Sequence, residues 1–134
     1  MALSNSEVVR SALAAFDQQD IETLLEWCTE DVEMRSAIVG GAEANVYRGH
    51  DGMRQWQRER DEAFDEIALS LHETHEIGDL VVALGHLHAR GAASGVSLDA
   101  ESGWVVSVRD GRMATLHGYL DHASALAAAR AGQK

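Results

Sequence analysis

Two histidines and an arginine alternate along one stretch of the chain: His86, His88 and Arg90. Side chains two residues apart on an extended strand point to the same face, so this spacing predicts one polar cluster. Such a cluster could hold a metal ion, or it could pair a histidine general base with an arginine that binds an anion. The solvent or dimer face of an antiparallel sheet would show the same pattern. No glutamate follows at the distance of a cupin-type metal site, so we expect no metal.

A second polar group lies where a strand is expected to run into a Gly-Asp turn: His72, Glu73, His75 and Glu76. Strand geometry would place His72 and His75 on opposite faces, which weakens any chelate. We therefore interpret this segment as a solvated edge of the sheet.

His117 and Asp121 flank Tyr119 on one expected strand, where they would share a face as a possible acid–base pair. Asp121, however, stands directly before an alanine-rich segment, and an aspartate in that position is typical of a helix N-cap. Asp51 precedes the next helical segment in the same way. We interpret both aspartates as caps rather than as catalytic acids.

The composition restricts the class of protein. The 134-residue chain carries 22 acidic and 11 basic residues, a formal net charge of −11, which argues against binding nucleic acid or a membrane surface. No apolar run approaches the ~20 residues of a membrane span, and the first residues lack the features of a signal peptide. The single cysteine, Cys28, is interpreted as a small core residue and suits a reducing compartment. We expect one cytoplasmic domain over residues 1–134.

The apolar periodicity predicts an α+β protein in the order helix, helix, strand, helix, four strands, helix. Ser4 and Glu7 form a capping box for the first helix, and Asp20 caps a second helix that is expected to run to Cys28. Residues 38–46 are expected to form a loop. The inner face of the third helix combines the residues Met53, Trp56, Arg60 and Phe64.

The last third of the chain, residues 103–129, predicts a strand, a tight turn, a strand and a closing helix. Its valines and Trp104 favour a pleated backbone, and Asp110-Gly111 suits a two-residue hairpin turn. A long antiparallel hairpin after a helical start indicates helices packed on a curved sheet, a cone that encloses a pocket.

This order of elements resembles the nuclear transport factor 2-like superfamily and, within it, the SnoaL-like polyketide cyclases. The resemblance spans Val8 to Leu126 and rests on the segments VVRSALAAF, DVE, YRGHDG, RDGR and YLD, which begin at residues 8, 31, 47, 109 and 119. It implies a cone of helices on a curved sheet, a small molecule bound inside the cone, and a homodimer that forms through the sheet.

The resemblance also places the family's catalytic residues. The aspartate and the histidine of the polyketide cyclases fall on Gly118 and Trp104, so both groups are missing here. The general base of ketosteroid isomerase falls on Met34-Arg35, and its oxyanion-hole tyrosine falls on Ala12. Neither family reaction has its usual acid and base in this chain.

The same alignment predicts which side chains face the interior. Those expected to point inward are Trp104, Val106, Val108, Ala114, Leu116 and Gly118. Those expected to point outward are Val105, Ser107, Arg109, His117, Tyr119 and Asp121. The substrate-binding wall is therefore expected to be apolar and to consist of Met34, Trp56, Trp104, Val106 and Leu116.

These observations lead to two hypotheses. In the first, the chain binds or transforms a hydrophobic carbonyl compound, polyketide- or steroid-like, by cofactor-free proton transfer, with His88 as the base and Arg90 or Tyr47 polarising the carbonyl. In the second, it is a non-catalytic small-molecule-binding or dimeric accessory module. Both hypotheses assume a cytoplasmic homodimer, without a cofactor, a metal, nucleic acid or a membrane as partner.

Overall fold

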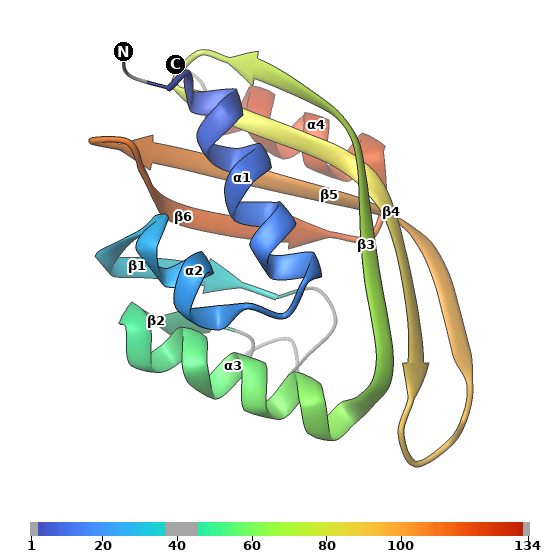
Figure 1. The fold of residues 1–134 in the computed structure, drawn as a ribbon. Coiled ribbons are helices and arrows are strands. Elements are labelled where there is room, and N and C mark those ends of the chain that lie inside the picture. Colours follow the sequence, from blue (N-terminus) through green and yellow to red (C-terminus); the bar gives the residue numbers. More distant parts are fainter. Residues whose placement is uncertain (1–2, 37–45, 133–134) are drawn as a thin grey trace.

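Six strands form one curved sheet in the order β2-β1-β6-β5-β4-β3 (Figure 1). The structure is a computed structural model that describes residues 3–36 and 46–132, so the expected loop lies almost entirely outside the described residues. All neighbouring strands pair antiparallel except β1 and β6, which are parallel. The strands are β1 (Cys28–Arg35), β2 (Val46–Arg48), β3 (Phe64–Ile77), β4 (Leu80–Gly91), β5 (Ser97–Arg109) and β6 (Arg112–Tyr119).

Helices cover both faces of this sheet. Figure 1 shows three of them on one face and the fourth on the other; they are α1 (Asn5–Asp17), α2 (Ile21–Glu26), α3 (Gly49–Ala63) and α4 (His122–Gly132). This mixed architecture confirms the α+β class and the curved sheet that the sequence predicts. We call the face toward α1, α2 and α3 the inner face, and the face toward α4 the outer face.

The main core lies between the inner face and the first three helices. The apolar stripe of α1 is buried there as the periodicity predicts, and the capping box of Ser4 and Glu7 is present. A smaller core lies on the outer face, where Val82, Val105 and Ala125 pack together between the sheet and α4. Residues 81–85 of β4 and 102–106 of β5 are consequently buried on both faces of the sheet.

The β5–β6 hairpin forms around the predicted two-residue turn. Asp110 and Gly111 both have positive φ angles, 54° and 76°, which is the geometry that an Asp-Gly pair favours in a hairpin. The register shifts between Ser107 and Val108, so that Met113 pairs with Val108 and is fully buried in the main core. Ala114, which the sequence predicts to point inward, is the extra residue of this bulge and is partly buried, whereas Met113 takes the fully buried position.

Three element boundaries differ from the sequence prediction. Cys28 is buried as expected, but it begins β1 instead of ending α2, and Phe64 begins β3 instead of ending α3. Tyr47 pairs with Met34 in strand β2, which the sequence does not predict. Helix α3 begins directly after this strand, at Gly49. Asp51 consequently lies within the first turn of α3 and is not its N-cap.

The aspartate before α4 does have the predicted role. One carboxylate oxygen of Asp121 accepts a hydrogen bond from the backbone N–H of Ser124 at 2.6 Å, and the other accepts from the Ser124 hydroxyl at 2.9 Å. These bonds lower the pKa of Asp121 and satisfy the start of the helix. Its carboxylate is therefore engaged in the helix cap.

Candidate functional site

The structure divides the sequence-predicted site residues between the two faces of the sheet. Met34, Trp104, Val106 and Leu116 are buried in the main core together with Trp56 of α3. On β4, Leu87 and Ala89 are buried, whereas His88 and Arg90, which alternate with them, point to the outer face. The sequence-based expectation that His88 and Arg90 line the same pocket as the apolar wall residues is therefore wrong, because the two groups lie on opposite faces of the sheet.

Three aromatic rings and one guanidinium form the centre of the interior, and we call Phe16, Trp56, Arg60 and Trp104 the inner aromatic cluster. The ring of Phe16 lies 5.0 Å from that of Trp56 and 5.6 Å from that of Trp104, between centroids. The Arg60 guanidinium carbon lies 5.5 Å from the Phe16 ring and 5.1 Å from the Trp56 ring. These distances are typical of aromatic and cation–π packing.

The inner aromatic cluster contains buried donors that have no acceptor among the described residues. They are the indole N–H groups of Trp56 and Trp104, together with Nε and Nη2 of Arg60. A buried donor without a partner costs about 1–3 kcal/mol, and more when it is charged. Because indole and guanidinium groups only donate, the interior as described presents an excess of donors.

Two small cavities adjoin this cluster, and Phe16 lines both. One, of about 20 Å³, is walled mainly by apolar groups of Phe16, Leu69, Leu87 and Trp104. The other, of about 10 Å³, lies between Phe16, Trp56 and Arg60 and the start of α2. Each is of the size of a single water molecule, whereas ligand pockets usually exceed about 300 Å³. A bound organic molecule would therefore have to displace side chains.

Trp104 and Gly118, which stand where the cyclases have their histidine and aspartate, are direct cross-strand neighbours. A Cβ atom on residue 118 would lie 3.1 Å from Cζ3 and 3.2 Å from Cη2 of Trp104, which is tighter than normal contact. The indole therefore occupies the space that a side chain at position 118 would need. Trp104 and Gly118, the two residues that differ from the cyclase pattern, therefore pack against each other.

Tyr47, the other predicted electrophile, is committed to a contact with α3. Its hydroxyl donates a hydrogen bond of 2.6 Å to Glu59. Burial, together with this bond to a carboxylate, raises the pKa of Tyr47 to about 12. Tyr47 belongs to the main core through its ring, but its hydroxyl is directed to Glu59.

On the outer face, His88 lies between two carboxylates. Its Nδ1 is 2.8 Å from Asp99, and its Nε2 is 3.2 Å from Glu66. The bond to Asp99 and then that to Glu66 raise the pKa of His88, because the protonated ring donates to both acceptors. Arg90 donates to Asp65 at 2.9 Å, and His86 lies 3.7 Å from Asp99. We call Glu66, His88, Arg90 and Asp99 the outer histidine cluster.

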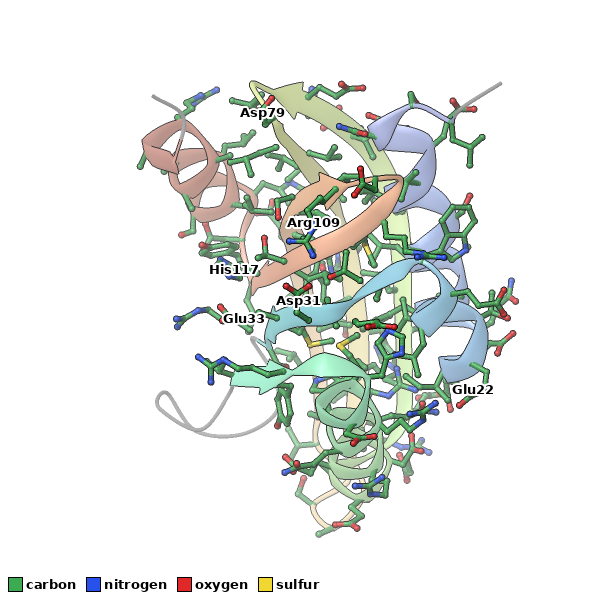
Figure 2. All side chains as sticks on the ribbon, turned by 90° about the vertical axis from the view of Figure 1, so that its left-hand side faces the viewer. Glu22, Asp31, Glu33, Asp79, Arg109 and His117 are labelled. Carbon is green, nitrogen blue, oxygen red and sulfur yellow. The ribbon has the colours of Figure 1, made fainter. Side chains whose placement is uncertain are left out.

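A second group of charges lies along β1, β5 and β6. It consists of Asp31, Glu33, Arg109 and His117, which Figure 2 labels on the side of the molecule turned toward the viewer. His117 Nε2 is 3.8 Å from Glu33. Partial burial and the nearby Arg35 lower the pKa of His117. Because Asp121 is engaged as the cap of α4, the structure does not join it to His117 as an acid–base pair. Over residues 3–36 and 46–132, no three His, Cys, Asp or Glu side chains are grouped to hold a metal.

Arg60 is the site residue that sequence reasoning missed. The sequence places it on the inner face of α3, four residues after Trp56, and that position is confirmed. A charged residue on an otherwise apolar helical stripe was the available signal.

Solved structures with the same architecture identify the fold class as NTF2-like. An NTF2-like protein of unknown function from Burkholderia pseudomallei is 24% identical over 93% of this chain and 97% of its own, with a TM-score of 0.77. TerC, co-crystallised with polyporic acid, is 22% identical over 96% and 98%, with a TM-score of 0.74. A protein of Catenulispora acidiphila with a ketosteroid isomerase-like fold, in complex with trimethylamine, is 14% identical over 98% and 96%, with a TM-score of 0.74.

The chain belongs to the SnoaL-like domain family, whose model matches residues 9–116. This confirms the resemblance seen in the sequence motifs. No curated protein matches the chain. Membership in the family supports a function in small-molecule binding or in polyketide-cyclase-like chemistry. Among the described helices, none is both long and apolar enough to cross a membrane.

The packing of Trp104 on Gly118 can be measured with a double-mutant cycle. Gly118→Val should destabilise the protein by about 1–3 kcal/mol, because the new side chain meets the indole. In a Trp104→Leu background the same substitution should be neutral or stabilising. Urea unfolding of the four proteins should give a coupling free energy of at least about 1 kcal/mol. Equal effects in both backgrounds would contradict the close contact.

The outer histidine cluster predicts a titration that NMR can follow. The pKa of His88 should lie above about 6.5, and Asp99→Asn should lower it more than Glu66→Gln does. Because protonated His88 is favoured in the folded state, its stabilising contribution should be complete below the unfolded pKa and should be lost as the pH rises through the folded pKa. A His88 pKa at or below 6.5 would show that the carboxylates do not engage the ring.

Proposed function

We propose that this chain binds a small, mainly apolar molecule in its interior, against the inner aromatic cluster. The observation that carries the proposal is the set of unpartnered donors inside an apolar wall, since ligand sites combine apolar surface with a few well-placed polar groups. The SnoaL-like family and the small molecules bound by two structural neighbours, polyporic acid and trimethylamine, support this class of function.

Two of the wall residues that the sequence suggested support this place: Trp104 lines one cavity and Trp56 lines the other. The other three, Met34, Val106 and Leu116, line neither cavity but belong to the same main core. Phe16 lines both cavities, so movement of its ring would join them into a larger space. Rearrangement of side chains on binding is common and needs no change in the backbone. We therefore propose that Phe16 is the residue that a ligand displaces.

Binding is better supported than proton transfer. Among the described residues that line the two cavities, Asp20 is the only carboxylate, and both of its oxygens accept hydrogen bonds from Thr23. Those bonds lower the pKa of Asp20 and make it a weak base. A base role for His88, with Arg90 or Tyr47 as the electrophile, stays a prediction. For His88 it would require a substrate on the outer face and loss of a proton that two carboxylates stabilise.

The test uses the neutral aromatic ketone 2-acetonaphthone, with calorimetry, thermal unfolding and stopped-flow tryptophan fluorescence. A ligand present at about 100 times its Kd should stabilise the protein by about 2.7 kcal/mol. Phe16→Leu should increase the association rate at least fivefold, because the smaller side chain obstructs the interior less. His88→Ala is the matched control on the outer face and should change Kd less than twofold.

Two results would contradict the proposal. The first is that neither the ketone nor the carboxylate of similar shape, 2-naphthoate, binds or stabilises the folded wild-type protein. The second is that binding is lost in His88→Ala while Phe16→Leu has no effect on its rate, which would place the site on the outer face.

A further inference from the structure

Arg60 is a buried charge in the middle of an apolar helical face. It is 2% exposed and follows Met53 and Trp56, both also buried, on the side of α3 that packs into the main core. Its burial lowers its pKa, although a guanidinium keeps its proton in proteins. Placing such a group inside a protein is expensive unless hydrogen bonds and charges compensate it.

The compensation that the described residues provide is incomplete. Asp61 Oδ1 lies 3.7 Å from Nε of Arg60, beyond hydrogen-bond distance, and its side chain is 54% exposed. Asp17 also acts on the charge, but one of its oxygens accepts the backbone N–H of Leu69 at 2.7 Å. The two aspartates thus balance part of the charge while Nε and Nη2 stay without an acceptor.

The two unpartnered nitrogens form one edge of the guanidinium. Their N–H bonds run parallel, and this edge matches the two oxygens of a carboxylate in a bidentate pair. The guanidinium carbon lies 5.5 Å from the centroid of the Phe16 ring and 5.1 Å from that of the Trp56 ring, within the range of cation–π packing. The Trp56 indole N–H, also without an acceptor, belongs to the same cluster, and a cavity of about 10 Å³ adjoins both residues.

We propose that Arg60 anchors the carboxylate of an apolar, aromatic ligand, with its Nε and Nη2 donating to the two oxygens. This inference rests on the proposed function and names the ligand class for the same site. The ligand's apolar body lies against Trp56 and Trp104, in space released by movement of Phe16. The carboxylate supplies acceptors that the described residues around Arg60 do not provide.

The net negative charge of the protein means that its surface does not favour the carboxylate over a neutral ligand. With a formal net charge of −11, the surface does not attract anions, so binding depends on the desolvated contact with Arg60. A buried ion pair is screened much less by salt than an exposed one. We therefore expect the preference for the anion to persist from 50 to 300 mM salt.

The test compares two probes of similar shape, 2-naphthoate and the neutral ketone 2-acetonaphthone, by calorimetry. The wild-type protein should bind the carboxylate at least tenfold more tightly. Arg60→Met, which keeps the length of the side chain without its charge, should weaken binding of the carboxylate much more than binding of the ketone and should therefore lose the preference. Arg90→Met, on the outer face, is the matched control and should retain it.

Stability gives a second readout. Replacing a poorly compensated buried charge with an apolar side chain is often neutral or stabilising, so ligand-free Arg60→Met should unfold at the same urea concentration as wild type or a higher one. Arg60→Lys keeps a positive charge but lacks the two parallel N–H donors that bind a carboxylate in a bidentate pair. It should therefore lose most of the preference for the carboxylate. This variant tests the inference even where Arg60→Met does not fold.

Each outcome separates the two proposals. If neither probe binds, the proposed function fails. If the ketone binds as tightly as the carboxylate, or if the preference survives in Arg60→Met, the function stands and the role of Arg60 is overturned. A crystal structure with only a water at the Nε–Nη2 edge and the carboxylate elsewhere would also overturn it.

Discussion

The packing of the Trp104 indole on the backbone of Gly118 is the contact on which the interior depends. It joins β5 to β6 on the inner face, and Trp104 in turn contacts Phe16 of α1 at 5.6 Å between ring centroids. Through Phe16 the contact reaches Trp56 and Arg60 of α3. The close approach between the two strands is thus linked by ring contacts to α1 and α3, and the two cavities beside these rings, as lined by the described residues, measure about 20 and 10 Å³.

The alternation of side chains along β4 separates two kinds of chemistry. Titratable groups gather on the outer face, where His88 lies between Asp99 and Glu66. Donors without an acceptor in the described part of the chain gather on the inner face, where Trp56, Trp104 and Arg60 are buried. A proton-transfer enzyme needs its base and its substrate pocket together. Here the interior offers hydrogen-bond donors and apolar walls, which favours binding over catalysis.

Much of the fold could be predicted because it depends on local patterns. Helical spacing in α1, the capping box of Ser4 and Glu7, and the Asp110-Gly111 turn are all encoded by neighbouring residues, and all are confirmed. The bulge that buries Met113 could not be predicted, since it depends on pairing between strands. The sequence also could not predict that two N–H donors of Arg60 have no acceptor among the described residues, because this depends on how side chains pack in three dimensions. The sequence located Arg60 on the inner face without revealing that its Nε and Nη2 have no hydrogen-bond acceptor among the described residues.

The most direct measurement of a ligand in the interior is the NMR spectrum of the three indole N–H groups, one from each tryptophan of the chain. With saturating 2-naphthoate, the signals of Trp56 and Trp104 should shift strongly as their environment changes. The signal of Trp27, which lies at the edge of the main core, should move little. Shifts confined to Trp27 or to the ring of His88, with Trp56 and Trp104 unchanged, would contradict an interior binding site.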